Sequence, residues 1–541
     1  MTSRATPRAS LDNIEEGAPL LSPDSEAFPL PIPDAAPKKH KPWLLLCVLI
    51  FFLVAIVDIG AFLAEAPKTR VYETNLCVRY YREHDPSKIV NGHVDEELCK
   101  EDVIQERLAS LFGWQELFDS IPGILLAVPL GTLADRVGRK WVFASCLMGL
   151  QLNSAWILLI CYFESLPLQL TWLSSAFYIC GGGPIVATAV GITMVSDICP
   201  PEKRTAIFLY LTASVLVAEL IAPILAARLM ESGNWFPLLL ALAIQQVGIC
   251  IAIFFPETLH LRDLPEPVDP PLSPSIELQT KPKTSIRKLF GFRAQVGHFR
   301  DAYLFLRRDY QLALVIFTFF ANRIGRQALT LLIRYASKRY HWKISQAAYL
   351  LSFRAATNLV ALTVFVPLVN LILLRVVRLP SHHADIWIAR GSIVLTTLAF
   401  FCMGTAAQPA LLIIGLLVFN LGTGYNAAMR SISIHVVGGQ SSPDTGRLFA
   451  VVAIIESIGT MIAGPTLSST FQWGIERGEP WIGAPFFFAT LIFGVMMLVT
   501  FAISFKSPVI IQYEDESGDE SERLASPRAS SSALRRSISP E

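Results

Sequence analysis

The sequence predicts an all-α membrane protein whose twelve transmembrane helices form two pseudo-symmetric bundles of six. Of its 541 residues, 52% are hydrophobic and 16% are charged, whereas soluble globular domains carry about 25% charged residues. Apolar segments long enough to cross the roughly 30 Å of hydrocarbon in a bilayer recur along the chain, with short polar stretches between them. Positions in the first half also recur in the second half at one constant offset, as described below.

The chain begins with a polar, Pro-rich segment, residues 1–42. A signal peptide would place its apolar run at the start, so we predict that this segment is not cleaved and forms a disordered cytosolic tail. Residues 43–255 form the predicted N-terminal bundle. Its six spans are expected at Trp43–Glu65, Leu108–Leu130, Trp141–Phe163, Leu168–Val195, Thr205–Glu231 and Trp235–Phe255.

A long polar loop, residues 66–107, follows the first span and contains Cys77 and Cys99. If this loop lies outside the cytosol, it is in an oxidising compartment where the two cysteines can form a disulfide. Two free thiols are the alternative. Most of the other cysteines lie in apolar spans, where a small buried hydrophobic side chain is the simpler interpretation.

The connection between the second and third spans, residues 131–140, reads G-T-L-A-D-R-V-G-R-K. Because nearly charge-free runs flank it, so polar a stretch must lie at a membrane face. Its glycines permit a tight turn, and its basic residues favour the cytoplasmic side. An ordinary basic loop is the alternative. The residues that carry the pattern are Gly131, Asp135, Arg136, Gly138, Arg139 and Lys140.

Residues 256–310 separate the two halves and are predicted to be cytosolic. Their first part is Pro-rich and acidic, which is typical of a linker. Their second part spaces Leu289, Phe292, Val296 and Phe299 three and four residues apart, with basic residues between them. This spacing predicts a basic amphipathic helix on the inner leaflet, and a helix packed against protein is the alternative.

Residues 311–505 form the predicted C-terminal bundle, and residues 506–541 form a Ser- and acid-rich tail that we expect to be disordered. Basic residues concentrate in the even-numbered connections, which predicts that these connections and both termini are cytosolic. Lys338, Arg339 and Lys343 run against this trend. The six spans of this bundle are expected at Leu312–Tyr335, Ser345–Leu374, Ile386–Thr405, Leu411–Val436, Leu448–Phe471 and Pro485–Phe505.

One constant offset superimposes Gly182 on Gly424 and Pro223 on Pro465. These positions lie in the fourth and fifth spans and in the tenth and eleventh, which predicts a duplicated six-helix unit. Small residues four apart let helix backbones approach closely, and a proline can kink a helix. We therefore predict that Pro223, Gly464 and Pro465 belong to helices that flex at a gate. The same offset also superimposes Pro201 on Pro443 and Glu202 on Asp444.

The pattern at residues 131–140 resembles the G-x-x-x-D-R-x-G-R-K signature between helices two and three of major facilitator superfamily transporters. The sequence Ala218-x-x-x-Ala222-Pro223-x-x-Ala226-Ala227 is similar to the G-x-x-x-G-P-x-x-G-G signature of proton-coupled antiporters in that superfamily. Alanine stands at every glycine position of this signature, which weakens the indication of export. Pro256-Glu257-Thr258 resembles the end of helix six in many members.

The resemblance implies a mechanical role for Asp135. In the superfamily, the corresponding carboxylate closes a cytoplasmic gate by meeting the N-terminus of helix eleven, which here lies near residues 446–448. The exposed amides and the dipole of a helix N-terminus attract a carboxylate. The alternative is that Asp135 only caps its own loop. Residues 375–390 contain no good copy of the motif, so the predicted gate is asymmetric.

Ionisable side chains inside the predicted spans are costly and therefore indicate a functional site. Acids predominate in the first half and arginines in the second, so a cleft between the halves would place an acidic wall against a basic one. An acid in such a cleft can carry a proton, and an arginine can hold it deprotonated until a substrate or a rocking motion separates the two. Snorkelling toward helix ends is the alternative for some of them, and Arg430 could instead pair with Asp197. Ionisable residues also lie within the spans at Glu116, Arg228, Arg326 and Arg354. The candidates for proton coupling or substrate binding that we single out are Asp58, Asp119, Glu219, Arg323, Arg430 and Glu456.

Other classes of function find no support in the sequence. A net charge of +1 does not indicate a nucleic-acid partner, and the cysteines lack the spacing of a metal site. Neither a nucleophile–base grouping nor a nucleotide-binding loop is visible, so we expect no enzyme, no catalytic residue and no cofactor. An ATP-driven pump would need a Walker loop.

The sequence therefore predicts a secondary active transporter that moves a small organic solute by alternating access, coupled to protons, with a preference for efflux by antiport. Proton-coupled uptake and a transport-dead sensor on the same fold are the alternatives. The predicted partners are a small-molecule substrate, protons and the lipid bilayer, and we expect a monomer. Residues 16–21 resemble an acidic dileucine sorting signal, which favours a vacuolar or endosomal membrane, and the plasma membrane is the alternative.

Overall fold

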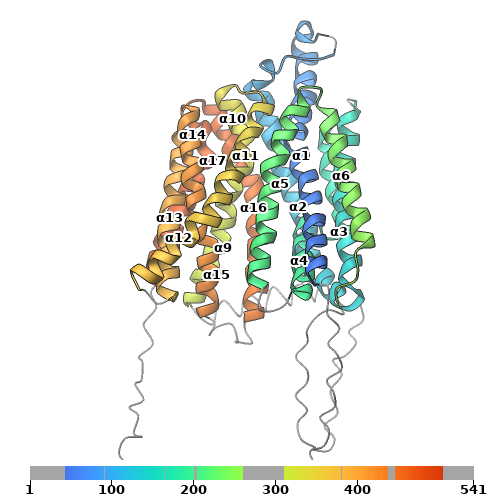
Figure 1. Ribbon diagram of the computed structural model, residues 1–541. Helices are drawn as coiled ribbons and strands as arrows, with labels where there is room; N and C mark the ends of the chain where they lie inside the picture. Colours follow the sequence, from blue (N-terminus) through green and yellow to red (C-terminus); the bar gives the residue numbers. More distant parts are fainter. Residues whose placement is uncertain are drawn as a thin grey trace, which may run out of the picture.

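The computed structural model describes residues 43–90, 92–163, 165–199, 204–259, 310–378, 381–436 and 445–503. Over these residues the chain is helical, and one isolated bridge, between Val90 and His93, is the sole strand-like contact. Figure 1 shows upright helices in two groups, with α1 to α6 on one side and α9 to α17 on the other. The predicted all-α membrane fold with two bundles is confirmed.

Each expected span corresponds to one helix or to a run of consecutive helices. The first group consists of α1 (Trp43–His84), α2 (Asp102–Val137), α3 (Arg139–Tyr162), η3 (Leu168–Cys180) with α4 (Gly183–Ile198), α5 (Arg204–Met230) and α6 (Trp235–Phe254). The second consists of α9 (Tyr310–Gln327) with η6 (Ala328–Leu331) and α10 (Leu332–Tyr340), α11 (Ile344–Val360) with η7 (Ala361–Phe365), α12 (Val366–Leu371) and η8 (Ile372–Val376), α13 (Ser381–Thr405), α14 (Pro409–Leu421) with α15 (Gly424–Val436), α16 (Thr445–Arg477), and η9 (Trp481–Gly483) with α17 (Ala484–Ala502).

Within the described residues, nine helices or helix runs are long and apolar enough to cross a bilayer. A tenth is α2, if its two parts, which meet at 49°, count as one span. Pro129 begins the second part, and a proline removes a backbone hydrogen bond and kinks a helix. The two other expected spans, α9 with α10 and α16, are less apolar because they contain Arg323, Arg326 and Glu456. These helices pack against other helices, so the structure is consistent with twelve spans.

Each group of helices has its own hydrophobic core. One core draws its buried side chains from α1 to α6, and the other draws nearly all of its side chains from α9 to α17. Ala66, Ala109 and Ala227 of the first group join the second core. The two halves are therefore separate packing units, and these three residues lie near one end of their shared seam.

α1 is longer than the sequence predicts. Its 42 residues extend about 63 Å at 1.5 Å per residue, because it continues past Glu65 to His84. The expectation of an irregular loop over residues 66–107 is wrong for this part, since polar residues show where the chain leaves lipid and not where a helix ends. Two 3-10 turns, η1 (Pro86–Lys88) and η2 (Leu98–Lys100), lead into α2, and a disulfide joins Cys77 to Cys99.

We call residues 66–107 the hairpin. The end of the molecule from which they project is the hairpin end, at the top of Figure 1. The opposite end, where α1 begins and α17 ends, is the terminal end. The predicted tails, residues 260–309 of the linker with its amphipathic helix, and the repeat positions 201, 202, 443 and 444 lie outside the described residues.

The loop expected over residues 131–140 is also shorter than predicted. α2 continues through Val137 and α3 starts at Arg139, so the break is Gly138 alone. Gly138 has a φ of 122°, which side chains with a Cβ rarely adopt. The glycine-rich, basic pattern therefore marks a sharp corner between two helices.

Gly181 allows η3 and α3 to touch. A Cβ atom at position 181 would lie 2.3 Å from the Cα atom of Cys146. The Cys146 thiol donates to the Gly181 carbonyl oxygen at 2.7 Å. Close helix packing therefore accounts for Gly181, whereas Gly182 and Gly183 have positive φ values of 78° and 68°.

Replacing Gly181 with alanine is expected to destabilise the protein by about 1–3 kcal/mol, the usual cost of forcing extra atoms into a packed site. Gly391→Ala on α13 is a matched control, because nothing lies within 4 Å of a Cβ at that position. Thermal unfolding of both purified variants in detergent measures the difference. Equal midpoints for the two would contradict the close contact.

Candidate functional site

An ion pair joins the two halves near the middle of the molecule. The Arg354 guanidinium of α11 donates to Glu219 Oε1 of α5 through Nε, at 3.0 Å, and also through Nη2. Glu219 lies fifteen residues after the start of α5, or about 22 Å along the helix axis. Its side chain is buried. The residues that form this pair are 135 positions apart in the chain.

Further charges surround this pair. The charges that act on Arg326 of α9 are those of Arg354, Arg323, Glu219 and Glu456, and the Arg326 guanidinium lies 5.4 Å from the ring centre of Phe419. No described carboxylate lies within ion-pair distance of Arg326 or Arg323, and Arg323 donates to the Thr460 hydroxyl at 2.8 Å. The structure thus gathers charges from both halves at one level.

The expected acidic and basic walls are partly present. Asp58 and Glu65 of α1 lie close enough to Glu219 for the charges to interact, so the first half presents three acids. Arg323, Arg326 and Arg354 come from the second half. Glu456 of the second half forms a longer ion pair of 3.7 Å with Arg430, and Asp197, the alternative partner of Arg430, instead pairs with Arg139.

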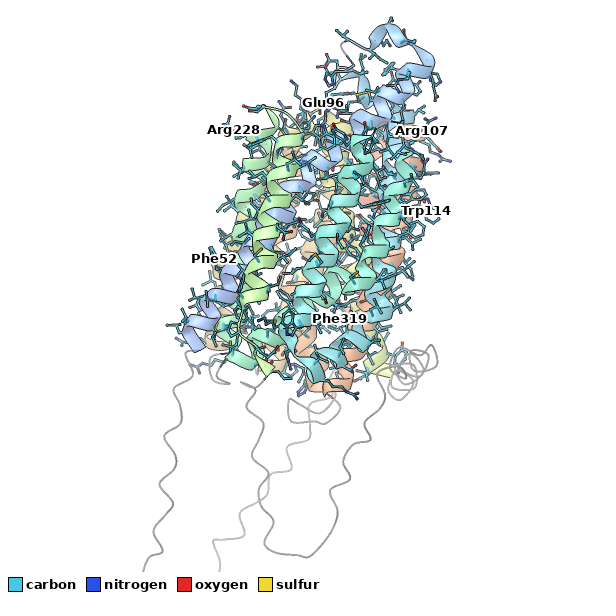
Figure 2. The ribbon with its side chains drawn as sticks, turned by 90° about the vertical axis from the view of Figure 1, so that its right-hand side faces the viewer. Phe52, Glu96, Arg107, Trp114, Arg228 and Phe319 are labelled. Carbon is cyan, nitrogen blue, oxygen red and sulfur yellow. A yellow bond between two sulfur atoms is a disulfide. The ribbon has the colours of Figure 1, made fainter. Side chains whose placement is uncertain are left out.

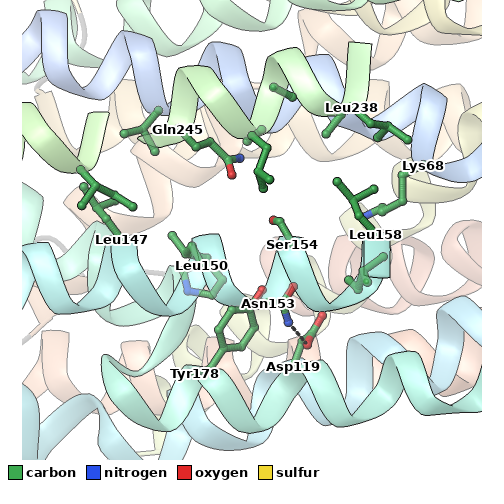
Figure 3. A pocket seen from close by; sticks show the side chains of 18 of the residues that line it. Lys68, Asp119, Leu147, Leu150, Asn153, Ser154, Leu158, Tyr178, Leu238 and Gln245 are labelled. Atoms are coloured by element: carbon green, nitrogen blue, oxygen red, sulfur yellow. Dashed lines mark hydrogen bonds between the residues drawn. The ribbon is translucent and has the colours of Figure 1, made fainter. Parts of the chain in front are cut away.

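Asp119 occupies a different place from the other candidates. Its Oδ1 atom accepts hydrogen bonds from Ser175 at 2.5 Å, Gln115 at 2.9 Å and Asn153 at 3.4 Å, all within the first half. Figure 3 shows Asp119 beside Asn153 in the wall of a cavity of about 260 Å³ that also contains the Lys68 side chain. All residues that line this cavity belong to the first half, to α1, α2, α3, η3, α4 and α6. Asp119 therefore lies inside one bundle and not at the seam.

Glu116 closes the seam on the hairpin side of the charge cluster. Its carboxylate accepts from Gln327 and Thr330 of the second half at 3.4 Å, and Arg334 lies 4.0 Å away. A Cβ at Gly464 of α16 would lie 2.7 Å from the Cβ of Glu116. Small residues therefore allow α2 and α16 to touch at this level.

The prolines of the two predicted flexing helices both lie in helix interiors. Pro223 is within α5, and Pro465 is within α16, directly after Gly464. Ala222 and Ala226 beside Pro223 are fully buried. The positions are those that the repeat predicts, whereas flexing itself stays a prediction.

At the terminal end, Arg139 is buried between two carboxylates. It forms ion pairs with Asp135 of α2, at 3.0 Å, and with Asp197 of α4, at 2.8 Å. Asp135 is half-exposed. Its predicted partner lies near residues 446–448, where the side chains of 446 and 447 are outside the described set, so this contact stays a prediction.

Glu257 lies beyond α6 and caps the N-terminus of α3. Its carboxylate accepts hydrogen bonds from the backbone N–H groups of Arg139 at 2.9 Å and Lys140 at 3.3 Å. Burial of this carboxylate acts to raise its pKa, but these two donors, together with the N–H groups of Thr258 and Leu259, outweigh burial and lower the pKa below its ordinary value. A Cβ at Gly138 would lie 2.5 Å from Glu257 Oε2.

Four residues of these clusters were not among the ionisable residues noted within the spans: Glu65, Arg334, Asp197 and Glu257. Arg334 lies where the expected seventh span ends, which concealed its contact with Glu116. Asp197 was considered for Arg430, but its partner is Arg139. The sequence did contain a pattern that could have predicted the role of Glu257. An acid follows a span directly, and a glycine precedes the basic end of the motif. This combination fits a carboxylate that caps a helix N-terminus.

Comparison with known proteins identifies relatives. The family model described as "Major Facilitator Superfamily" matches residues 104–464. The chain is 34% identical over 478 residues to a protein of Emericella nidulans named MFS efflux pump atnC, covering 88% of this chain and 90% of the relative. It is 28% identical over 492 residues to the efflux pump ustT of Aspergillus flavus, covering 88% and 94%.

Solved structures share the fold. The human organic anion transporter MFSD10 (TETRAN) aligns with a TM-score of 0.54 at 17% identity, covering 85% of this chain and 99% of that one. The nucleoside transporter NupG aligns with a TM-score of 0.53 at 12% identity, covering 84% and 98%. At these identities the likeness shows the fold alone.

Glu257→Gln is expected to destabilise the protein at neutral pH. Because its folded pKa lies below the ordinary value of 4.5, Glu257 stabilises the fold fully above that value and loses this contribution as pH falls through the folded pKa. The difference in thermal midpoint between the wild type and Glu257→Gln should therefore be constant near neutral pH and shrink below about pH 4.5. Thermal unfolding across this range measures it, and a difference that grows in acid would contradict the assignment.

Proposed function

This chain belongs to the Major Facilitator Superfamily, and from that membership we propose that it exports a small organic solute in exchange for protons. Membership of this family supports the function of a secondary transporter. We therefore propose no catalytic residues. The names of the two relatives reported above support export. The observation that carries proton coupling is the ion pair between Glu219 and Arg354, because it joins the two halves and contains a group that can bind a proton.

In this proposal the ion pair between Glu219 and Arg354 controls whether the two halves can separate. Deprotonated Glu219 holds Arg354 and with it the second half. When a proton binds Glu219, the carboxylate loses its charge and the attraction to the guanidinium weakens. The two halves can then rock apart at this level, and they close again when the proton leaves. Proton binding need only shift an equilibrium between two states of similar free energy.

The cargo pathway is the seam between the halves. Glu116 and the contact of Gly464 with α2 close the seam toward the hairpin end. Arg323 and Arg430 are exposed on the terminal side of this closure. We infer that the described state binds cargo from the terminal end, and that Asp135 closes this end in the opposite state by meeting the N-terminus of α16.

The terminal end faces the cytosol in this proposal. The support is the set of basic residues Arg136, Arg139 and Lys140 at that end, which favour the cytosolic side. The disulfide of the hairpin fits the opposite, oxidising side. Either the plasma membrane or the vacuolar membrane would satisfy this orientation.

Glu219→Gln is expected to abolish the pH-dependent part of export, because the amide cannot carry a proton. Cells that make this variant, the wild-type protein or no such protein are compared for retained metabolites at two external pH values. Glu231→Gln is a matched control, since Glu231 directly follows the same helix and forms an exposed pair with Arg228. Export by Glu219→Gln with unchanged pH dependence would remove Glu219 from the coupling.

A double variant, Glu219→Gln with Arg354→Gln, separates coupling from folding. The single variant leaves a partly buried arginine without its partner, which costs less than the roughly 3–5 kcal/mol of a fully buried pair, whereas the double variant removes both charges. The double variant is therefore expected to recover thermal stability relative to Glu219→Gln without recovering pH-dependent export. Recovery of both would show that the charge pair acts only on stability.

A further inference from the structure

We propose that the hairpin is a latch that holds the two halves closed at the hairpin end, and that the Cys77–Cys99 disulfide keeps this latch in position. Figure 2 shows Glu96, a residue of the hairpin, at the hairpin end of the helices. The proposal concerns how the closed state is held. It does not depend on which solute is carried or on which group binds the proton.

A buried charge network makes the base of the hairpin rigid. Glu73 of α1 is fully buried and accepts from Arg70 at 2.6 Å, from Lys100 at 2.7 Å and from Gln105 at 2.7 Å. Lys100 and Arg70 also pair with Glu96, at 3.4 and 3.5 Å. Two acids and two bases therefore balance each other in the first half, and Glu96 is held in place.

From this position Glu96 reaches the second half. Its Oε1 atom accepts a hydrogen bond from the backbone N–H of Ile344 at 2.8 Å. Ile344 is the first residue of α11, whose initial N–H groups lack partners within the helix. A carboxylate at such a helix N-terminus is stabilised by these N–H groups and by the helix dipole. Glu96 thus caps a helix of the opposite half.

A second contact lies beside the first. Lys338 of α10 pairs with Asp102 Oδ1 at 2.5 Å and donates to the backbone carbonyl oxygen of Lys100. Lys338 is buried. This contact explains why a basic residue that runs against the charge trend is placed here. The hairpin groups that make these polar contacts with the second half therefore come from residues 96–102.

The disulfide ties this same segment to α1. Cys99 lies within residues 96–102, and its partner Cys77 lies on the extension of α1. Val78, Tyr81, Val94 and Ile104 pack around the two cysteines in a small apolar core. A covalent tie of this kind limits the conformations of the segment before it binds. The latch therefore loses less entropy when it engages the second half.

Opening at the hairpin end requires that the contacts of Glu96 with Ile344 and of Asp102 with Lys338 break. Both break together, because one segment carries both. The latch thus favours the state closed at the hairpin end and slows opening on that side. A weaker latch shifts the equilibrium toward the opposite state.

A cysteine on the seam measures this opening. Ser468 of α16 is buried against Gly113 of α2, on the hairpin side of Glu116. The full chain carries Ser468→Cys, with the accessible Cys180, Cys250 and Cys402 replaced by serine. The protein is placed in lipid nanodiscs and treated with a membrane-impermeant maleimide, and the rate of labelling at position 468 is recorded.

Glu96→Gln and the pair Cys77→Ser with Cys99→Ser are each expected to raise this rate several-fold. Glu97→Gln is the matched control, because Glu97 is exposed, and its rate should not change. Combining Glu96→Gln with the cysteine changes should give no more than the larger single effect, since both act on one segment. If the protein with Cys77→Ser and Cys99→Ser fails to fold, the labelling rate of Glu96→Gln alone decides the test. Unchanged labelling in folded Glu96→Gln protein would overturn the latch.

Discussion

The structure depends on the cost of placing a charge in the low-dielectric interior of a membrane protein. An arginine or a carboxylate at mid-membrane is tolerated when it faces the inside of the bundle and finds a partner. Here Glu219 and Arg354 pair across the seam, so for these two charges each half supplies the partner of the other. Two bundles with separate hydrophobic cores are thereby held in register by polar contacts.

Polar contacts suit a seam that must open. In lipid, apolar side chains gain little by meeting each other, because the surrounding acyl chains are equally apolar. The halves therefore have no strong hydrophobic drive to stay together, and a few charged and hydrogen-bonded contacts decide their position. Gly113 and Gly464 add a close backbone contact without bulky side chains that would interlock. Breaking such a seam exposes groups that water can solvate.

The sequence predicted the features that depend on local chemistry. Hydropathy located each span, because the bilayer selects for apolar runs of a fixed length, and the motif at 131–140 marked a corner between helices. Helix ends were less predictable: α1 continues to His84 because solvent-exposed polar residues form helices as well as loops. The partners of the charged side chains were the least predictable feature. Asp119 and Glu219 look alike as acids within spans, yet only the fold decides that one is enclosed by Ser175 and Gln115 and the other meets an arginine 135 positions away.

Near the terminal end the two halves hold a buried or partly buried arginine with different partners, and this difference bears on how that end moves. In the first half, Arg139 is held by the carboxylates of Asp135 and Asp197. In the second, Arg390 donates to the backbone carbonyl oxygens of Phe501 and Ile503, both at 3.2 Å. Carboxylates can exchange partners or bind protons, whereas carbonyl oxygens at a helix end are fixed by the backbone. The first half therefore contains the ionic contacts that can rearrange at this end, and the arginine of the second half anchors its last helix.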